Sequence, residues 1–304
     1  NAKGEIIDPI NPETGKSWGW SDVADLNYDN QALREEMTAD MLHWIKNENI
    51  DGFRCDVASN VPLDFWQQAI PELRKEKNIF MLAEAWEPEL LKEGLFDMAY
   101  GWEAHHTMNR IAQGKNTVKD WDKFMAENDI KYSSDDILMN FVDNHDENSW
   151  NGTIRGRLGK GEEAMTALSY VMPGMPLIYS GNEYGLNHSL KFFEKDSIPK
   201  TKGKDWELRA KLGKLKTENT ALNGGKNKAK YTRIKTDDDT NILAFTREKN
   251  GKKVVYIANF SNNPIKTKVE IKGEFTNYMT GEKMKLNEKQ IFSIEPWQYY
   301  ILTE

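Results

Sequence analysis

The chain has 304 residues, of which 38% are hydrophobic and 11% aromatic, as expected for one large globular domain or two unequal ones. Its formal net charge of −7 argues against a nucleic-acid partner or an anionic membrane surface. No apolar run approaches the roughly 20 residues of a membrane span, so we expect no membrane insertion. The single cysteine, Cys55, excludes a disulfide framework and a cysteine metal site, and it leaves the cellular compartment open.

Residues 1–28 are rich in Asn, Asp, Pro, Gly and Trp, which predicts an irregular loop region. After it, short and continuously apolar segments alternate with segments whose apolar residues recur at helical spacing. We expect strands at 50–55, 79–86, 95–102, 137–147 and 175–183, and helices at 30–46, 63–77, 103–113, 117–127, 161–172 and 205–218. This alternation predicts a parallel sheet that is buried on both faces.

The composition changes after residue 222. The segment NGGKNK at 223–228 predicts a hinge, and β-rich segments follow it. Within 241–260 the pair Asn250-Gly251 is typical of a two-residue hairpin turn. Further strands are expected at 268–273 and 298–303. We therefore predict three parts, which are a loop region over 1–28, an α/β part over 29–222 and an all-β domain over 223–304.

Acidic residues stand where the predicted strands end. Asp56 closes the first strand, Glu84 the second, and Asp143 and Asp146 lie at the end of the fourth. In a parallel α/β barrel the carboxyl ends of the strands converge on the face that carries the active site. Helix capping is the alternative explanation, but it does not account for an acid followed by AW or for the cluster DNHDEN.

Paired carboxylates on either side of a scissile bond are the arrangement of a glycosidase. One carboxylate attacks the sugar, and the other is kept protonated so that it can protonate the leaving oxygen. Arg54 precedes Asp56 by two residues and therefore shares its face of the strand. We expect this ion pair to be buried, with Arg54 holding Asp56 ionised and oriented.

Four motifs follow one another along the chain, namely GFRCDVA at 52–58, AEAW at 83–86, FVDNHD at 141–146 and GMPLIYSGNE at 174–183. In this order they resemble motifs of the α-amylase family of retaining glycoside hydrolases, and ADLNYDN at 24–30 is similar to a fifth segment of that family. The resemblance implies an α/β fold that comprises the C-terminal part of a TIM (β/α)8 barrel, about strands 4–8, followed by a small antiparallel β-sandwich domain. It also implies that the first three strands lie upstream, so we expect residues 1–304 alone to show no amylase activity.

The resemblance implies roles for the matching residues. Asp56 matches the catalytic nucleophile, Glu84 the general acid/base, and Asp146 a third carboxylate that binds substrate hydroxyls. Substrate contacts are implied for Arg54, Trp86, Trp102, Asn144 and His145. The two tryptophans, together with Trp150, are candidates for stacking on sugar rings, although buried aromatic residues more often belong to cores.

A metal is expected only as a structural calcium ion, because the glycosidase chemistry itself needs no cofactor. Asp25 matches an aspartate that can bind calcium in the family. Ser59 and Asn60, however, stand where many amylases have a Lys-His pair involved in substrate and calcium binding. Asp25 is therefore the single candidate metal ligand.

The implied function is cleavage of α-1,4-glucosidic bonds in starch or maltooligosaccharides by double displacement. The valine in FVDNHD is more similar to amylases than to the α-1,6-glucosidases of the family. The alternatives are an oligosaccharide α-glucosidase, a transglycosylase, or a non-catalytic glucan-binding relative, which the presence of all three carboxylates argues against. The family resemblance favours a secreted or periplasmic protein, with a cytoplasmic one as the alternative.

Two other segments have features that suggest ligand binding. The pair His105-His106 suggests a metal site, but we expect a solvated role or one at the edge of the substrate, because no carboxylate has the spacing of a helical ligand pair. The segment RGRLGKG at 155–161 lacks the spacing of a phosphate-binding loop, and we expect an ordinary loop there.

Overall fold

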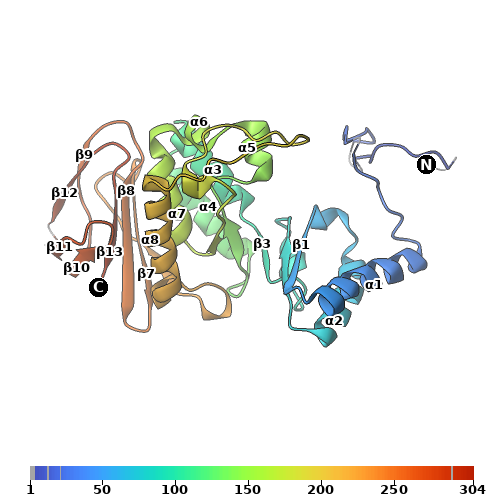
Figure 1. Ribbon diagram of the computed structural model, residues 1–304. Helices are drawn as coiled ribbons and strands as arrows, with labels where there is room; N and C mark the ends of the chain where they lie inside the picture. The colour runs from blue at the N-terminus through green and yellow to red at the C-terminus, as the bar shows by residue number, and fades with distance from the viewer. Residues whose placement is uncertain (1–3, 12–13, 21, 289) are drawn as a thin grey trace. The chain divides into compact units, whose positions relative to one another are not determined.

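The computed structural model describes residues 4–11, 14–20, 22–288 and 290–304. They form two compact units (Figure 1). Unit 1 takes in Asn1–Glu84 and Glu93–Leu95, and unit 2 takes in Ala85–Lys92 and Phe96–Glu304. The predicted limits at residues 28 and 222 stay a prediction. None of the described helices is long and apolar enough to cross a membrane.

In unit 1 the described residues before Asn30 are irregular, as predicted, and two helix–strand pairs follow. Its elements are α1 (Gln31–Glu48), β1 (Gly52–Cys55), α2 (Leu63–Glu76) and β2 (Phe80–Ala83). Helix α1 starts at Asn30, whose side chain accepts a hydrogen bond from the Ala32 N–H at 3.0 Å. Strands β1 and β2 pair in parallel, with Cys55 opposite Ala83.

The barrel part of unit 2 contains three short parallel strands, β3 (Met98–Tyr100), β4 (Leu138–Asn140) and β5 (Met175–Pro176). Six helices accompany them: α3 (Trp102–Ala112), α4 (Val118–Lys131), α5 (His145–Asn151), α6 (Ile154–Leu158), α7 (Glu162–Val171) and α8 (Lys204–Glu218). The predicted alternation of strands and helices is therefore confirmed in both units.

Several of the predicted segments are wrong in extent or type, and the strands expected at 79–86 and 95–102 shorten to Phe80–Ala83 and Met98–Tyr100. The strand expected over 137–147 ends at Asn140, because Asn144 accepts a hydrogen bond from the Glu147 N–H at 2.8 Å and so caps a helix, α5. The strand expected over 175–183 has two residues, because its partner strand β4 ends at Asn140, which stands opposite Pro176. The loop expected over 155–161 is largely helical, since the Thr153 side chain caps α6.

The C-terminal strands form a six-stranded antiparallel sheet in the order β11-β10-β13-β8-β7-β6 and a two-stranded sheet of β12 and β9. Their bounds are β6 (Lys230–Arg233), β7 (Ile242–Lys249), β8 (Lys252–Asn259), β9 (Ile265–Lys268), β10 (Gly273–Asn277), β11 (Lys283–Leu286), β12 (Ile291–Ile294) and β13 (Tyr299–Thr303). Asn250 and Gly251, both at positive φ, make the predicted hairpin turn between β7 and β8. The strand predicted at 268–273 is wrong, because the Ile271 N–H bonds back to the Val269 carbonyl in a tight turn between β9 and β10.

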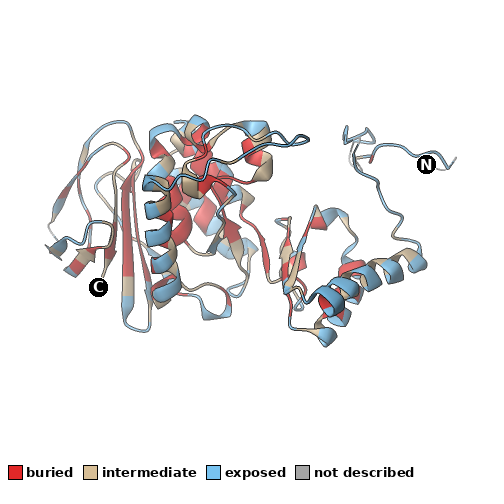
Figure 2. Ribbon diagram, in the orientation of Figure 1, coloured by how far each residue is buried: buried red, intermediate tan, exposed pale blue. Residues whose placement is uncertain are grey.

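Strands β7 and β8 are buried on both faces. Leu243, Phe245 and Tyr256 pack with helices α7 and α8, and the alternate residues Ala244 and Ile257 face a second core within the β domain. Figure 2 shows this burial along both strands and in α7. The helices of the barrel part and the large sheet thus share one hydrophobic core.

Candidate active site

The two predicted catalytic carboxylates of unit 1 lie just past the ends of β1 and β2. Because Cys55 stands opposite Ala83 in a parallel register, the residues that follow them, Asp56 and Glu84, leave the strands as neighbours. The Arg54 guanidinium bridges the two acids. It pairs with Oδ1 of Asp56 through Nη1 and lies 2.9 Å from Oε1 of Glu84 through Nη2. The structure therefore brings these three predicted residues together.

Glu84 is fixed by both its side chain and its backbone. Its Oε2 accepts a hydrogen bond from the Val57 N–H at 2.8 Å, and its own N–H donates to the Cys55 carbonyl at 3.0 Å. Val57 has a φ of 41°, a left-handed conformation that is strained for a β-branched residue. This strained turn aims the N–H of Val57 at the Glu84 carboxylate.

The surroundings of Glu84 favour its protonated form. Burial raises its pKa, and the charge and hydrogen bond of Asp56 act in the same direction. The Val57 N–H and the Arg54 charge oppose this rise without cancelling it. A raised pKa is the direction that a general acid requires.

The expected burial of the Arg54–Asp56 pair is wrong within unit 1. The side chain of Asp56 is 70% exposed, and in β1 only Cys55 is buried. The physical reason is that β1 is the edge strand of its sheet among the residues that the structure describes. Its pairing with β2 covers one side, and Asp56 lies beyond the end of the strand.

The third predicted carboxylate, Asp146, lies in the first turn of α5 in unit 2. Asn144 is the capping residue of this helix, and His145 follows it, with Nε2 3.4 Å from Oδ2 of Asp146. The side chains of His145 and Asp146 are partly exposed, whereas Asn144 is buried. The FVDNHD motif therefore displays its last two residues at the start of a helix.

A buried polar network lies beneath this turn, and the sequence analysis missed it. Nη2 of Arg157 donates to Oδ1 of Asp143 at 2.7 Å, and Nη1 lies 3.7 Å from Oε2 of Glu147. The Asn182 side chain donates to the other oxygen of Asp143 at 3.3 Å. His105 joins the network through Nε2, which lies 3.0 Å from the Glu147 carboxylate. Three helices are thereby tied to the end of β4.

The acids of this network differ in their proton affinity. Burial raises the pKa of Asp143 to about 6, although the Arg157 charge and the Asn182 hydrogen bond oppose it. Burial also acts to raise the pKa of Glu147, but the hydrogen bond and charge of His105 together with Arg157 hold it below its ordinary value. The network therefore keeps one firm anion, Glu147, beside an acid that titrates near neutrality.

The expectation of a solvated His105 is wrong. This residue is buried on the inner side of α3, where its ring stacks on Phe141 with centroids 4.6 Å apart. Its Nδ1 lies 3.1 Å from the Phe141 carbonyl and its Nε2 faces Glu147. Both ring nitrogens thus have acceptors, and His105 supports the polar network instead of contacting solvent.

The predicted stacking residues Trp86 and Trp102 differ in how far their rings are exposed and in how far they pack against other aromatic side chains. Trp86 is exposed and lines a cavity of about 510 Å³ with Trp102 and Tyr132, whose hydroxyl donates to the Trp86 carbonyl at 2.5 Å. The Trp102 ring is stacked on Tyr100 at 5.7 Å and packs edge-on against Phe141 at 5.0 Å. Trp86 therefore has the freer ring for a ligand, and Trp102 is partly engaged in the core.

A family profile described as the alpha amylase catalytic domain matches residues 18–252. The chain belongs to the alpha-amylase family. Alpha-amylase MalA of Haloarcula japonica is 22% identical over 89% of this chain and 40% of its own length. The intracellular maltogenic amylase of Bacillus subtilis is 26% identical over 80% and 42%, and a 4-alpha-glucanotransferase of Thermotoga neapolitana is 29% identical over 53% and 37%. The chain thus spans about 40% of the length of these relatives.

Solved structures show the fold. Maltogenic alpha-amylase AmyB of Thermotoga neapolitana is similar with a TM-score of 0.84 at 23% identity, covering 98% of this chain and 71% of its own. An alpha-amylase of Lactobacillus plantarum is similar with a TM-score of 0.83 at 21% identity, covering 100% and 72%. The predicted fold class, the C-terminal part of a TIM barrel followed by a small antiparallel β domain, is therefore confirmed.

Asp25, the expected calcium ligand, is exposed in the irregular part of unit 1. Among the described residues, no group of three or more His, Cys, Asp or Glu side chains is placed to hold a metal ion. Calcium at Asp25 therefore stays a prediction for this alpha-amylase relative.

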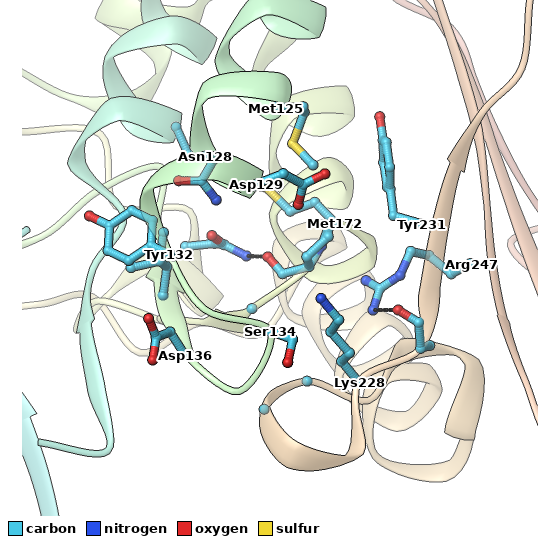
Figure 3. Close-up of a pocket in the computed structure, with 18 of the residues that line it drawn as sticks. Met125, Asn128, Asp129, Tyr132, Ser134, Asp136, Met172, Lys228, Tyr231 and Arg247 are labelled. Atoms are coloured by element: carbon cyan, nitrogen blue, oxygen red, sulfur yellow. Dashed lines mark hydrogen bonds between the residues drawn. The ribbon is translucent and has the colours of Figure 1, made fainter. Parts of the chain in front are cut away.

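Another cavity of unit 2 lies at the amino ends of strands β4 and β5, away from their carboxyl ends. It has a volume of about 370 Å³ and is lined by α4, the loop after it and the 224–231 segment. Leu138 and Gly174, at the amino ends of β4 and β5, line it, whereas Asp143 follows the carboxyl end of β4. Figure 3 shows Arg247 at its wall, where the buried guanidinium donates to the Ala229 carbonyl at 3.5 Å. This cavity is separate from the predicted catalytic residues of unit 2.

Proposed function

We propose that the protein containing this chain is a retaining glycoside hydrolase that cleaves α-1,4-glucosidic bonds of starch or maltooligosaccharides. The observation that carries this proposal is the bridge from Arg54 to Asp56 and Glu84 at the ends of two parallel strands. Membership of the alpha-amylase family and the amylase names of the relatives support it.

In the first step, a carboxylate oxygen of Asp56 attacks the anomeric carbon and forms a covalent glycosyl ester. The bond between that carbon and the leaving oxygen breaks, and Glu84 gives its proton to this oxygen. The raised pKa of Glu84 supports its role as the proton donor. Arg54 provides the positive charge that orients both acids.

In the second step, Glu84 removes a proton from water, and the water oxygen attacks the anomeric carbon and releases Asp56. Two inversions give overall retention of configuration. Both carboxylates pair with the same Arg54 guanidinium, Asp56 through Nη1 and Glu84 through Nη2. This shared partner supports retention, because an inverting enzyme needs its carboxyls about 6.5–9.5 Å apart to admit a water molecule.

The remaining predicted residues complete the proposal. Asp146 would bind sugar hydroxyls through its partly exposed carboxylate, and Trp86 would stack on a sugar ring. Further contacts are proposed for His145, Asn144 and Trp102, and a structural calcium ion is proposed at Asp25. The expected partners are α-glucans or maltooligosaccharides, without nucleic acid or membrane insertion.

A transglycosylase that acts on the same bonds is the second candidate. The 4-alpha-glucanotransferase of Thermotoga neapolitana, 29% identical over 53% of this chain, favours it. Both candidates use the same first step and differ in the acceptor of the second, which is water or a sugar hydroxyl. Mass spectrometry of products from maltotriose separates them, since transfer yields chains longer than the substrate.

The test is Glu84→Gln in the full-length protein, with starch and an α-maltosyl fluoride as substrates. Loss of the proton donor should slow starch cleavage by about 10²–10⁴-fold. Fluoride release should suffer much less, because fluoride leaves without a proton. The matched control is Glu89→Gln, an exposed glutamate close by in sequence, which should leave both rates unchanged.

Two results would contradict the proposed chemistry. Equal losses on both substrates would assign Glu84 a structural role. Proton NMR that detects a β-anomer as the first product of an α-glucan would exclude the double displacement through Asp56.

A further inference from the structure

Three large aromatic side chains lie exposed together on unit 2. They are Trp150 at 60% exposure in α5, and Phe192 at 43% and Phe193 at 71% in the loop between β5 and α8. The ring centroids of Trp150 and Phe192 are 5.1 Å apart, and those of Phe192 and Phe193 are 4.9 Å apart. We call these three residues the aromatic platform. Leaving so much contiguous apolar surface in water is unfavourable, and such patches mark binding sites.

The backbone that carries the two phenylalanines is held in place by α5. The buried Asn148 side chain accepts a hydrogen bond from the Leu190 N–H at 2.7 Å and donates to the His188 carbonyl at 3.3 Å. The Ser149 hydroxyl donates to the Leu190 carbonyl at 3.0 Å. Helix α5 therefore fixes both Trp150 and the loop that brings the phenylalanines next to it.

Asp196, which follows the two phenylalanines in the chain, also holds this loop in place. Asp196 accepts a hydrogen bond from the Lys191 N–H at 3.2 Å and lies 3.7 Å from Nε2 of His188. Phe192 and Phe193 thus stand between two fastened points of the chain. These exposed side chains are therefore carried by a turn whose backbone is held by hydrogen bonds, as a preorganised binding surface requires.

The platform continues toward the predicted substrate residues of the same unit. The His145 ring lies over Phe192 with centroids 6.4 Å apart and planes inclined by 25°. His145 in turn contacts Asp146. A row of rings therefore leads from the Asp146 carboxylate outward over Phe192 to Phe193, with Trp150 beside it.

We propose that the aromatic platform binds further glucosyl units of an α-glucan whose chain passes Asp146. The carbon-bound hydrogens of a pyranose face pack on aromatic rings, while the hydroxyl groups at its edge meet charged side chains. Lys191 and Glu194, an exposed ion pair with 2.7 Å between Nζ and Oε2, supply such an edge. This inference rests on the proposed function, because it takes His145 and Asp146 as substrate residues.

The platform should therefore favour long substrates over short ones. In the full-length protein, Phe193→Ala should reduce kcat/KM on maltoheptaose about tenfold more than on 4-nitrophenyl maltoside, the effect of losing one stacking ring. Phe193→Trp should keep the preference for the long substrate, and Phe193→Leu should lose it, since leucine is apolar but has no ring face. The matched control is Ile130→Ala, which removes an 87% exposed apolar side chain on α4. It should leave kcat/KM unchanged on both substrates.

Binding should follow the same order. In a Glu84→Gln background, calorimetry with maltoheptaose should give a Kd about tenfold weaker for Phe193→Ala than for Phe193→Trp. Circular dichroism and the melting temperature of each variant verify that the fold is retained.

Three outcomes would overturn the inference while leaving the proposed function intact. They are equal losses on the long and short substrates, leucine behaving like tryptophan at position 193, or a change of oligomeric state without a change in glucan binding. The absence of turnover of every α-glucan by the unmodified protein would instead refute the proposed function. In that case a Kd for maltoheptaose that depends on the ring at position 193 would still support the platform.

Discussion

Replacing Arg157 with methionine keeps much of the side-chain volume but removes the guanidinium from the buried network of unit 2. Nη2 of Arg157 lies 2.7 Å from Oδ1 of Asp143, whose side chain is 1% exposed. Nη1 lies 3.7 Å from Oε2 of Glu147, whose side chain is also largely buried. Breaking a buried ion pair by removing one partner costs about 3–5 kcal/mol, because a buried charge is left without compensation.

The loss of stability in Arg157→Met should depend on pH, because protonation neutralises the Asp143 carboxylate that is left without its partner. Burial raises its pKa from 3.8 to about 6 even with Arg157 present. A folded-state pKa above the unfolded value means that the folded state binds the proton more tightly, so stability falls as pH rises from about 4 to about 6. This loss amounts to about 3 kcal/mol in the natural chain. Without Arg157 the pKa of Asp143 rises further, and the fall continues to higher pH.

Urea unfolding at pH 5, 6.5 and 8, followed by circular dichroism and tryptophan fluorescence, measures the effect. The free energy of unfolding of Arg157→Met should lie about 3–5 kcal/mol below that of the natural chain at pH 8, and the gap should narrow at pH 5. Arg155→Met on the same helix is the matched control. Its side chain is 39% exposed and pairs with Glu162 and Asp205, so about 1 kcal/mol or less is expected.

The reasoning is wrong if Arg157→Met costs no more than Arg155→Met at pH 8, or if the gap is the same at pH 5. A double-mutant cycle adds a second criterion. Asp143→Asn removes the charge that Arg157 neutralises, so the double variant should be more stable than the sum of the single effects by more than about 1 kcal/mol. Additive losses would show that the two residues do not act as a pair.

Three further predictions concern single positions. In Gly52→Ala the new Cβ would lie 1.8 Å from the Phe80 carbonyl oxygen, so thermal unfolding should show a free energy of unfolding lower by about 3 kcal/mol or more. The control Gly213→Ala has open space around its new Cβ in α8 and should be neutral or stabilising by up to about 1 kcal/mol. Burial and the nearby Arg247 lower the pKa of Lys216 to about 7, below its unfolded value, so stability should rise between pH 7 and 9, and Lys216→Met should abolish the rise in urea unfolding. Asn144→Ser should keep the helix cap that Asn144→Ala loses at a cost of about 1 kcal/mol, and a raised KM in both variants would assign the side-chain NH₂ group to substrate.

Features that depend on local spacing could be predicted from the sequence. The apolar periodicity of α1 and the turn pair Asn250-Gly251 each determine their own element with little help from the rest of the chain. The proximity of Asp56 and Glu84 was predictable for a related reason. Once two strands are parallel and in register, the residues that follow their carboxyl ends are neighbours.

Features that depend on long-range packing could not be predicted in this way. His105 and Arg157 are polar residues in helical segments, and nothing in their immediate sequence distinguishes a buried polar side chain from a solvated one. Their burial follows from partners contributed by other elements, such as the Phe141 carbonyl for His105 and Asp143 for Arg157. The early end of β4 likewise depends on a cap formed by Asn144. The spacing of apolar residues along the sequence carries no information about such partners.

The FVDNHD motif shows how support and catalysis divide among neighbouring residues. Sequence reasoning assigned substrate roles to Asn144, His145 and Asp146, yet the most firmly held acid of the motif is Asp143. The Asp143 carboxylate is buried and accepts hydrogen bonds from Arg157 and Asn182, so we infer that it anchors the chain at the end of β4. Asn144 then starts α5, and the helix presents Asp146 three residues after the anchor. An exposed acid can be positioned accurately only by buried neighbours, which is why a motif of adjacent polar residues contains both kinds.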